Sequence, residues 1–257
     1  MTRVVFVTLL LAPALMAAAA LIGQRLGPSA AGWVVALPVS FAVAVVAVTL
    51  DAGARTASTM ALSAGTHVPA QIAFAVVFAG VLPRRGVFAG GAGATVAYVA
   101  SGVALTNLPD VLVLVCAVPA LVFAPRFMPE GRPRTASQTR WQAMALTCVV
   151  SSLIVGAAVL TSRVAGPHAA GAVVAFPTMS TTLAVVLVAR DGPLAGAHAL
   201  AGLVRSLPCY LVFCVVIVLT TPSLGLAGIA LALLACVAAG RATWRGVPVA
   251  RRPAPAR

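Results

Sequence analysis

The chain has 257 residues, of which 61% are hydrophobic and only 8% are charged, and its mean hydropathy is +1.09. Soluble domains carry about 25% charged residues, so this composition excludes a soluble globular protein, and it equally excludes a disordered or a disulfide-stapled one. The formal net charge is +13, and because every basic residue is an arginine, the lysine-dependent chemistry of P-loops and Schiff bases is also excluded.

The predicted elements are transmembrane helices, because a helix needs roughly 20 apolar residues to cross a bilayer. The first uncharged run, 4–22, has the features of a secretory signal peptide, with Arg3 ahead of it and small residues near its end. Its counterpart at 143–161 in the repeat described below cannot be a signal, so we expect 4–22 to be the first span. Further uncharged runs lie at 31–50, 64–83, 86–107, 143–162, 169–189 and 206–240.

Two segments decide the number of spans. The run 206–240 is interrupted by turn-forming residues at 220–225, so we expect two helices there and eight spans in all. The segment 108–125 is a ninth candidate, although its strongly apolar core, 111–124, is short enough for a re-entrant segment. We predict that it spans, because valine and leucine dominate it and Asp110 can lie among the headgroups. The expected fold is an all-α, polytopic membrane helix bundle of about nine transmembrane helices.

The chain contains an internal duplication. Residues 27–38 (GPSAAGWVVALP) and 166–177 (GPHAAGAVVAFP) are identical at nine of twelve positions, at an offset of 139. Chance identity is far lower, so this pattern indicates two homologous four-helix repeats. If 108–125 spans the membrane, the second repeat is inverted relative to the first; if it does not, the repeats are parallel. We favour the inverted arrangement.

The duplication divides the chain into five parts. They are a first membrane repeat at 1–107, a linking span at 108–125, a basic cytoplasmic loop at 126–142, a second membrane repeat at 143–240 and a basic cytoplasmic tail at 241–257.

The arginines predict the orientation of the chain. With nine spans, one side of the membrane holds thirteen arginines, five of them in the tail, and the other side holds three. With eight spans the split is twelve to four. Because cytoplasmic loops retain positive charge, both counts place the C-terminus in the cytoplasm. We expect the protein in the bacterial plasma (inner) membrane, with its N-terminus outside in the nine-span topology.

The motif GP-x-x-AG-x-x-A-x-P, followed by a short turn and by the long helix ALAGLVRSLPCYLVFCVVIVL, carries a resemblance. In these features the chain resembles a family of uncharacterised bacterial inner-membrane proteins, which occur as single four-helix units or as tandem duplications of about this length. The resemblance covers nearly the whole chain and implies the duplicated membrane fold. The family has no assigned substrate, so the resemblance implies no residue roles.

Two prolines at matching positions of the repeats predict the site. Pro38 and Pro177 lie inside predicted spans, where proline removes a backbone donor and leaves the carbonyl four residues earlier without its partner. Such breaks are tolerated where protein or a water-lined cavity receives them, and paired breaks indicate a transporter's binding site. The alternative is that these are ordinary membrane prolines and that the neighbouring hydroxyls bond back to their own helix. The expected solute-binding hydroxyls are those of Ser40, Thr178, Ser180 and Thr181.

Arg205 is the one arginine that no predicted loop contains. A helix that begins at Asp191 would carry it roughly 21 Å along the axis, inside a core about 30 Å thick. A charge at that depth must face protein or water, so Arg205 is a candidate solute-binding residue, together with His198 on the same helical face. Alternatively, 191–203 lies in the interface and Arg205 extends to the headgroups.

The sequence offers no constellation for catalysis. It has no paired carboxylates, no HExxH or GxSxG motif and no histidine pair with ligand spacing, so we expect neither an enzyme nor a bound metal or cofactor. Its five cysteines lie in apolar runs and are expected to behave as small hydrophobic residues.

The leading hypothesis is therefore a transporter or exporter of a small solute, with its site at the interface of the two repeats. The alternative is a non-transporting membrane scaffold or assembly partner, for which glycine and alanine packing is sufficient. Membrane lipids and a small solute are the expected partners, nucleic acid is not expected, and a homodimer is left open.

Overall fold

Every regular element described in the computed structural model is helical. The described residues are 29, 33–34, 37–129 and 141–244. Outside these residues lie the predicted first span and most of the first repeat motif, of the basic loop and of the tail. Five described segments are long and apolar enough to cross a membrane, which agrees with the predicted membrane helix bundle. These segments are Val68–Leu105, Asp110–Phe127, Gly166–Asp191, Pro193–Leu224 and Leu226–Trp244.

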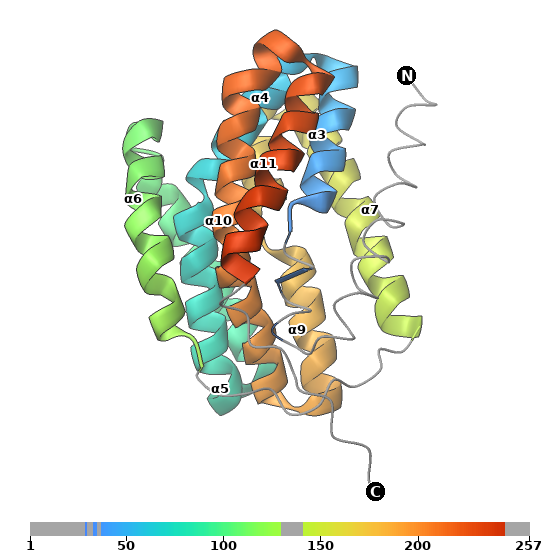
Figure 1. Ribbon diagram of the computed structural model, residues 1–257. Coiled ribbons are helices and arrows are strands. Elements are labelled where there is room, and N and C mark those ends of the chain that lie inside the picture. The colour runs from blue at the N-terminus through green and yellow to red at the C-terminus, as the bar shows by residue number, and fades with distance from the viewer. Residues whose placement is uncertain (1–28, 30–32, 35–36, 130–140, 245–257) are drawn as a thin grey trace, which may run out of the picture.

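The elements form a bundle of roughly parallel and antiparallel helices (Figure 1). In chain order they are α3 (Val39–Ala52), α4 (Ala54–Thr66), α5 (Val68–Leu105), α6 (Asp110–Phe123) with the 3₁₀ turn η1 (Ala124–Phe127), α7 (Trp141–Val164), α8 (Gly166–Ala175), α9 (Thr178–Asp191), α10 (Pro193–Leu224) and α11 (Leu226–Trp244).

Helix α5 consists of two helices joined at a sharp turn. Gly86 has φ 77° and ψ −177°, a conformation that a residue with a Cβ rarely adopts, and the chain reverses direction there. The two arms correspond to the predicted spans 64–83 and 86–107. The predicted division of 206–240 is likewise found at Gly225, where α10 ends and α11 begins.

Helix α10 passes through the centre of the bundle and contacts α4, α5, α9 and α11 (Figure 1). Its large side chains Leu200, Leu207 and Phe213 are almost completely buried. Burial of such side chains against neighbouring helices contributes packing energy that lipid contact on one face alone does not supply. This central helix therefore holds the other elements in register around it.

Helix α6 lies at the edge of the bundle and presents apolar side chains outward. Val111 and Val122 are 73% and 64% exposed, and Phe88 on α5 is 94% exposed. Exposed apolar side chains in such number would be a liability in water and are expected where the surrounding solvent is lipid. Together with η1, α6 forms the 18-residue segment Asp110–Phe127, which is long and apolar enough to cross a membrane.

An ion pair joins α7 to α3 at one end of the bundle. The Arg163 guanidinium, at the end of α7, forms a bidentate hydrogen bond with the Asp51 carboxylate at the end of α3, with Nε donating to Oδ2 over 2.7 Å. Both residues lie just outside the predicted spans. The hydrogen bond from Arg163 lowers the pKa of the Asp51 carboxyl below its ordinary value.

We expect this ion pair to add stability that is lost in acid. Because the folded pKa of Asp51 is lowered, its contribution is complete above the unfolded pKa, near 4, and disappears as the pH falls through the folded pKa. Asp51→Asn should therefore lower the melting temperature at pH 7 slightly and flatten the acid limb of the stability profile below pH ~4. Thermal unfolding of the purified protein between pH 3 and 7 measures this, and an unchanged acid limb would contradict it.

Candidate functional site

The two predicted helix breaks are present in the structure. Helix α8 ends at Ala175 and α9 begins after Pro177, while α3 begins after Pro38. The two prolines have nearly the same backbone angles, φ −73° and ψ 39° at Pro38 and φ −78° and ψ 52° at Pro177. The turn before each helix is also the same, since Val39 N–H and Thr178 N–H each bond to the carbonyl two residues earlier over 2.7 Å.

The expectation that each proline leaves a carbonyl without a donor is wrong. The Val34 carbonyl accepts the N–H of Leu37 over 3.2 Å, and the Val173 carbonyl accepts the N–H of Phe176 over 3.3 Å. The last turn before each break tightens to a bond between residues three apart, which satisfies a carbonyl that the proline cannot reach. The breaks are therefore accommodated by local backbone geometry.

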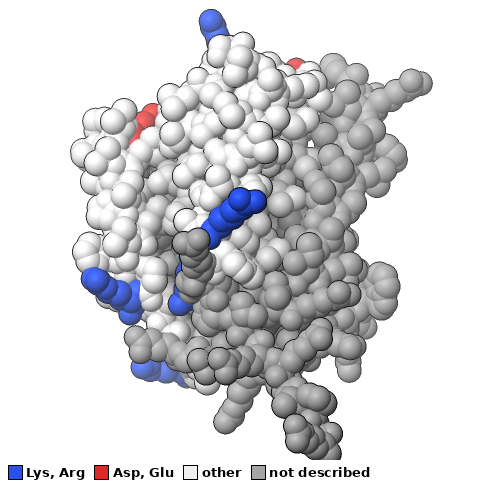
Figure 2. All heavy atoms as spheres, viewed as in Figure 1, with Lys and Arg blue, Asp and Glu red and all other residues white. Residues whose placement is uncertain are grey.

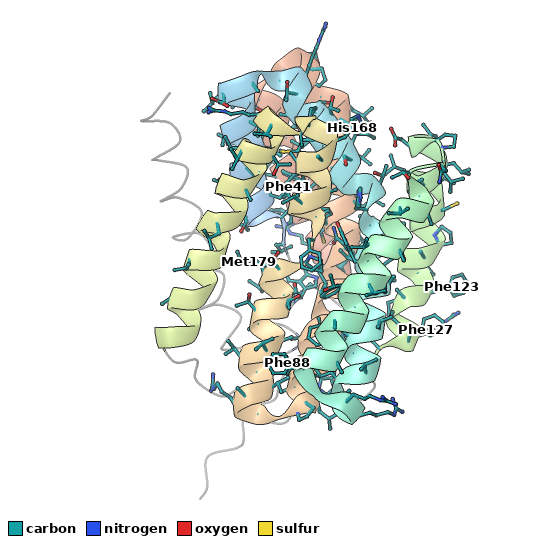
Figure 3. The ribbon with its side chains drawn as sticks, turned by 180° about the vertical axis from the view of Figure 1, so that it is seen from behind. Phe41, Phe88, Phe123, Phe127, His168 and Met179 are labelled. Carbon is teal, nitrogen blue, oxygen red and sulfur yellow. The ribbon has the colours of Figure 1, made fainter. Side chains whose placement is uncertain are left out.

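Both breaks face one cavity of about 70 Å³ near the middle of the bundle. The residues at the start of α3 and the start of α9 line it from opposite directions, and α5 and α10 complete its walls. In Figure 3, Phe41 and Met179, one from each break, lie near mid-height of the bundle. The cavity is lined by Leu37, Pro38, Ser40, Phe41, Gln71, Val174, Ala175, Phe176, Pro177, Thr178, Met179, Ser180, Leu203 and Tyr210.

The polar side chains of this central cavity are deeply buried. Gln71, Tyr210 and Ser180 are 3%, 6% and 2% exposed, respectively. The Tyr210 hydroxyl lies near the side chains of Gln71 and Cys214 but makes no well-aligned hydrogen bond to a described residue. A buried hydroxyl without a full hydrogen bond costs free energy unless something else meets it. None of the described residues that line the cavity is a carboxylate. The cavity thus offers hydrogen-bonding groups without acidic charge.

The threonines that follow Pro177 bond back to their own chain, as the alternative interpretation predicted. Thr181 Oγ1 donates to the Pro177 carbonyl over 2.8 Å, and Thr178 Oγ1 donates to the Phe176 carbonyl over 3.2 Å. Thr178 nonetheless lines the cavity, whereas Thr181 does not. Of the expected hydroxyls, Ser40, Thr178 and Ser180 are therefore brought together.

Arg205 and His198 lie on α10, outside the lining of the central cavity. Helix α10 is continuous from Pro193 to Leu224, so 193–203 forms one helix with the apolar run that follows it. Arg205 is twelve residues into this helix, about 18 Å along its axis, and is half-buried. His198 is buried, and its Nε2 has no partner among the described residues.

The interpretation of the sequence missed Gln71 and Tyr210. Their numbers differ by 139, the offset of the repeat, and each follows by two residues a proline of the matched pair Pro69 and Pro208. Extending the alignment of the repeats into the long helices would have found them. The signal was weak because glutamine and tyrosine share no obvious chemistry in the sequence.

A second, larger cavity of about 440 Å³ lies where α5 ends and α6 begins. We call it the vestibule; Figure 3 shows His168, one of its lining residues, toward the upper end of the bundle. It brings together His67, His168 and Asp110, which are far apart in the sequence, although no group of three such residues among those described is arranged to hold a metal ion. Its remaining lining residues are Ser63, Thr66, Gly102, Leu105, Thr106, Leu108, Ala169 and Ala172.

An aromatic wall separates the vestibule from the central cavity. The ring of Phe176, which lines the central cavity, packs edge-on against Tyr98 and Phe74, with centroid distances of 5.1 Å and 5.3 Å. The Tyr98 hydroxyl donates to the Ala172 carbonyl over 2.8 Å, and the Tyr98 ring lies 6.0 Å from that of His67, a vestibule residue. Helix α8 thus borders the vestibule on one side and the central cavity at its end.

Comparisons of this chain with protein-family models, with curated proteins and with solved structures found no match.

Proposed function

We propose that the protein is a membrane transporter or exporter of a small solute, and that the central cavity is its binding site. The main support for this proposal is that α3 and α9 each begin directly after a proline and that both begin at the same cavity, which polar side chains help to line. Discontinuous helices that meet near the bilayer midplane are the usual construction of solute sites in secondary transporters. A scaffold held together by glycine and alanine packing has no need of such a cavity.

The arrangement of the helices supports an inverted repeat. Helices α3 and α9 are each 14 residues long and begin 139 residues apart, and the turns at Gly86 and Gly225 are separated by the same offset. In Figure 1, α3 runs upward from the middle of the bundle, whereas α9 runs downward from it. A pseudo-two-fold axis in the membrane plane would relate helices in this way. Nine spans, including the first one at 4–22, remain part of the proposal.

The two sides of the central cavity are packed differently, which supports access from one side at a time. Under the repeat offset of 139, the vestibule residues Ala172 and Leu105 correspond to Trp33 and Trp244, which lie on the other side of the cavity. Those two tryptophans pack edge-on at 4.8 Å, and Trp33 Nε1 donates to Thr243 Oγ1 over 3.2 Å. Large rings therefore fill the space that is open in the vestibule. Opening one end while the other is closed is the expected geometry of alternating access.

The arginines support a cytoplasmic location for the tryptophan end and the C-terminus. Most blue atoms in Figure 2 lie at mid-height or below, and the red atoms lie near the upper edge. Arg84 and Arg85 at the turn of α5, Arg126 in η1 and Arg190 in α9 belong to helix ends at the lower side of Figure 1. Under the positive-inside rule this side faces the cytoplasm.

We expect reporter fusions at residue 2 and at residue 257 to give opposite results, with the first outside and the second in the cytoplasm. The physical reason is the arginine asymmetry together with an odd number of spans. A phosphatase and fluorescent-protein reporter pair at each end measures it. Two ends on the same side would remove one span and, with it, the inverted repeat.

The proposal is tested by flux. Proteoliposomes that contain the full-length chain should carry at least one small solute of a chemically varied set faster than protein-free vesicles do. If every solute crosses both kinds of vesicle at the same rate, while the protein is folded and correctly inserted, the transporter proposal is wrong and the scaffold is favoured.

A further inference from the structure

Two helix N-termini converge on the central cavity. Helices α3 and α9 both begin there, and neither has a side-chain cap. The N–H groups of Val39 and Thr178 each bond to the carbonyl two residues earlier. The aligned peptide dipoles nonetheless give each of these helix ends a partial positive charge. Two such ends at one buried site attract negative charge more strongly than one, because a low-dielectric surrounding screens them little.

A buried side chain points to the same kind of ligand. The Tyr210 hydroxyl makes no well-aligned hydrogen bond to a described residue, and Tyr210 lines the cavity beside Gln71, whose amide carries N–H donors. Hydroxyl and amide groups can donate to an oxyanion and complete the ring of donors begun by the two helix ends. A transported cation would instead be expected to meet a carboxylate, and none of the described lining residues is one.

The size of the cavity limits the ligand. Its volume of about 70 Å³ is several times the ~10–15 Å³ that one water molecule needs in the same measure. The rings of Phe41 and Phe176 form apolar walls that leave little room for a long chain. A small, compact solute therefore fits this space best.

We propose that the solute is a small monovalent oxyanion, such as an inorganic oxyanion or a short carboxylate, bound between the N-termini of α3 and α9 with Tyr210 as a donor. This inference rests on the proposed transport function and specifies its substrate class. Arg205 lies on α10 between the cavity residues Leu203 and Tyr210, is half-buried and is paired with no carboxylate among the described residues. Its positive charge at the level of the cavity favours an anion over a cation there.

The test uses solutes of one shape and different charge. Nitrate, urea and guanidinium share a planar, Y-shaped arrangement of heavy atoms, and acetate adds a carboxylate of similar size. Proteoliposomes with the full-length chain should carry nitrate or acetate about tenfold faster than protein-free vesicles, a ratio that marks clear recognition, and should not accelerate urea or guanidinium. Comparing nitrate with acetate distinguishes an inorganic oxyanion from a carboxylate.

A pair of variants places the anion at the helix end. Ser180 and Thr56 are each the third residue of their helix, α9 and α4, but only Ser180 lines the cavity. Ser180→Asp should reduce anion flux by about tenfold or more, because a fixed carboxylate occupies the same N–H groups, and an acidic residue in the first turn does not disfavour the helix. Thr56→Asp carries the same charge at an outer helix end and should leave the flux unchanged.

The outcomes separate the two proposals. Accelerated flux of urea or guanidinium, with no effect on either anion, would overturn the oxyanion assignment and leave transport standing. Equal losses of anion flux in Ser180→Asp and Thr56→Asp would also overturn it, because the effect would then come from the added negative charge and not from its position at the cavity. No accelerated flux of any solute in this or the wider set would contradict transport itself.

Discussion

Replacing Gly171 with alanine is expected to prevent α8 from packing against α4. A Cβ at Gly171 would lie 2.4 Å from the Met60 carbonyl oxygen, 2.6 Å from Ser63 Cβ and 2.9 Å from the Ala64 backbone nitrogen. These are largely backbone atoms of α4, which cannot rotate away, and the Ser63 hydroxyl also holds α8 by donating to the His168 carbonyl over 2.7 Å. Overpacking of a rigid contact should cost about 3 kcal/mol or more, or prevent accumulation of the folded protein.

The matched control is Gly91→Ala. Gly91 is also a helical glycine, on α5, but nothing lies within 4 Å of the Cβ that alanine would add. Alanine is favoured over glycine in a helix by roughly 1 kcal/mol, so this variant should be as stable as the parent or more so. The two variants are compared by their melting temperatures in detergent, with the amount of monodisperse protein remaining after heating as the readout. Equal melting temperatures would show that α4 and α8 do not approach as closely as described.

Replacing both Pro38 and Pro177 with alanine is expected to lower solute flux by about tenfold or more, because each break can then heal into a continuous helix. The N–H of the new alanine would bond to the carbonyl of Val34 or Val173, and the free N-termini at the cavity would disappear. Expression should be retained, since alanine is the better helix former. The initial rate of uptake into proteoliposomes, per molecule of inserted protein, measures the effect.

The control for this prediction is Pro119→Ala. Pro119 also lies inside an apolar helix, α6, but it lines neither cavity. Its replacement removes the same kind of ring without touching a break that faces the site, so flux should remain within about twofold of the parent. If the double variant of Pro38 and Pro177 transports as well as Pro119→Ala does, the breaks serve packing and the central cavity is not the site.

The sequence by itself determined the features that depend on local chemistry. Apolar runs of sufficient length predict membrane helices because a bilayer excludes unpaired backbone groups wherever they occur in the chain. Proline lacks its N–H in any context, so the breaks at Pro38 and Pro177 could be predicted, as could the turn that ends α10 near Gly225. The offset of 139 could be recognised because nine of the twelve motif residues are identical in the two copies.

Only the tertiary structure decided which of these features meet. Gln71 and Tyr210 share a cavity because α5 and α10 pack side by side, and His67 and His168 share the vestibule because α8 lies against the end of α4. The sequence likewise did not decide whether α10 continues through Arg205, because 191–203 is equally compatible with a segment that lies in the membrane interface. Packing between helices is set by close approaches such as that at Gly171, and these depend on residues more than a hundred positions apart, which no local pattern in the sequence records.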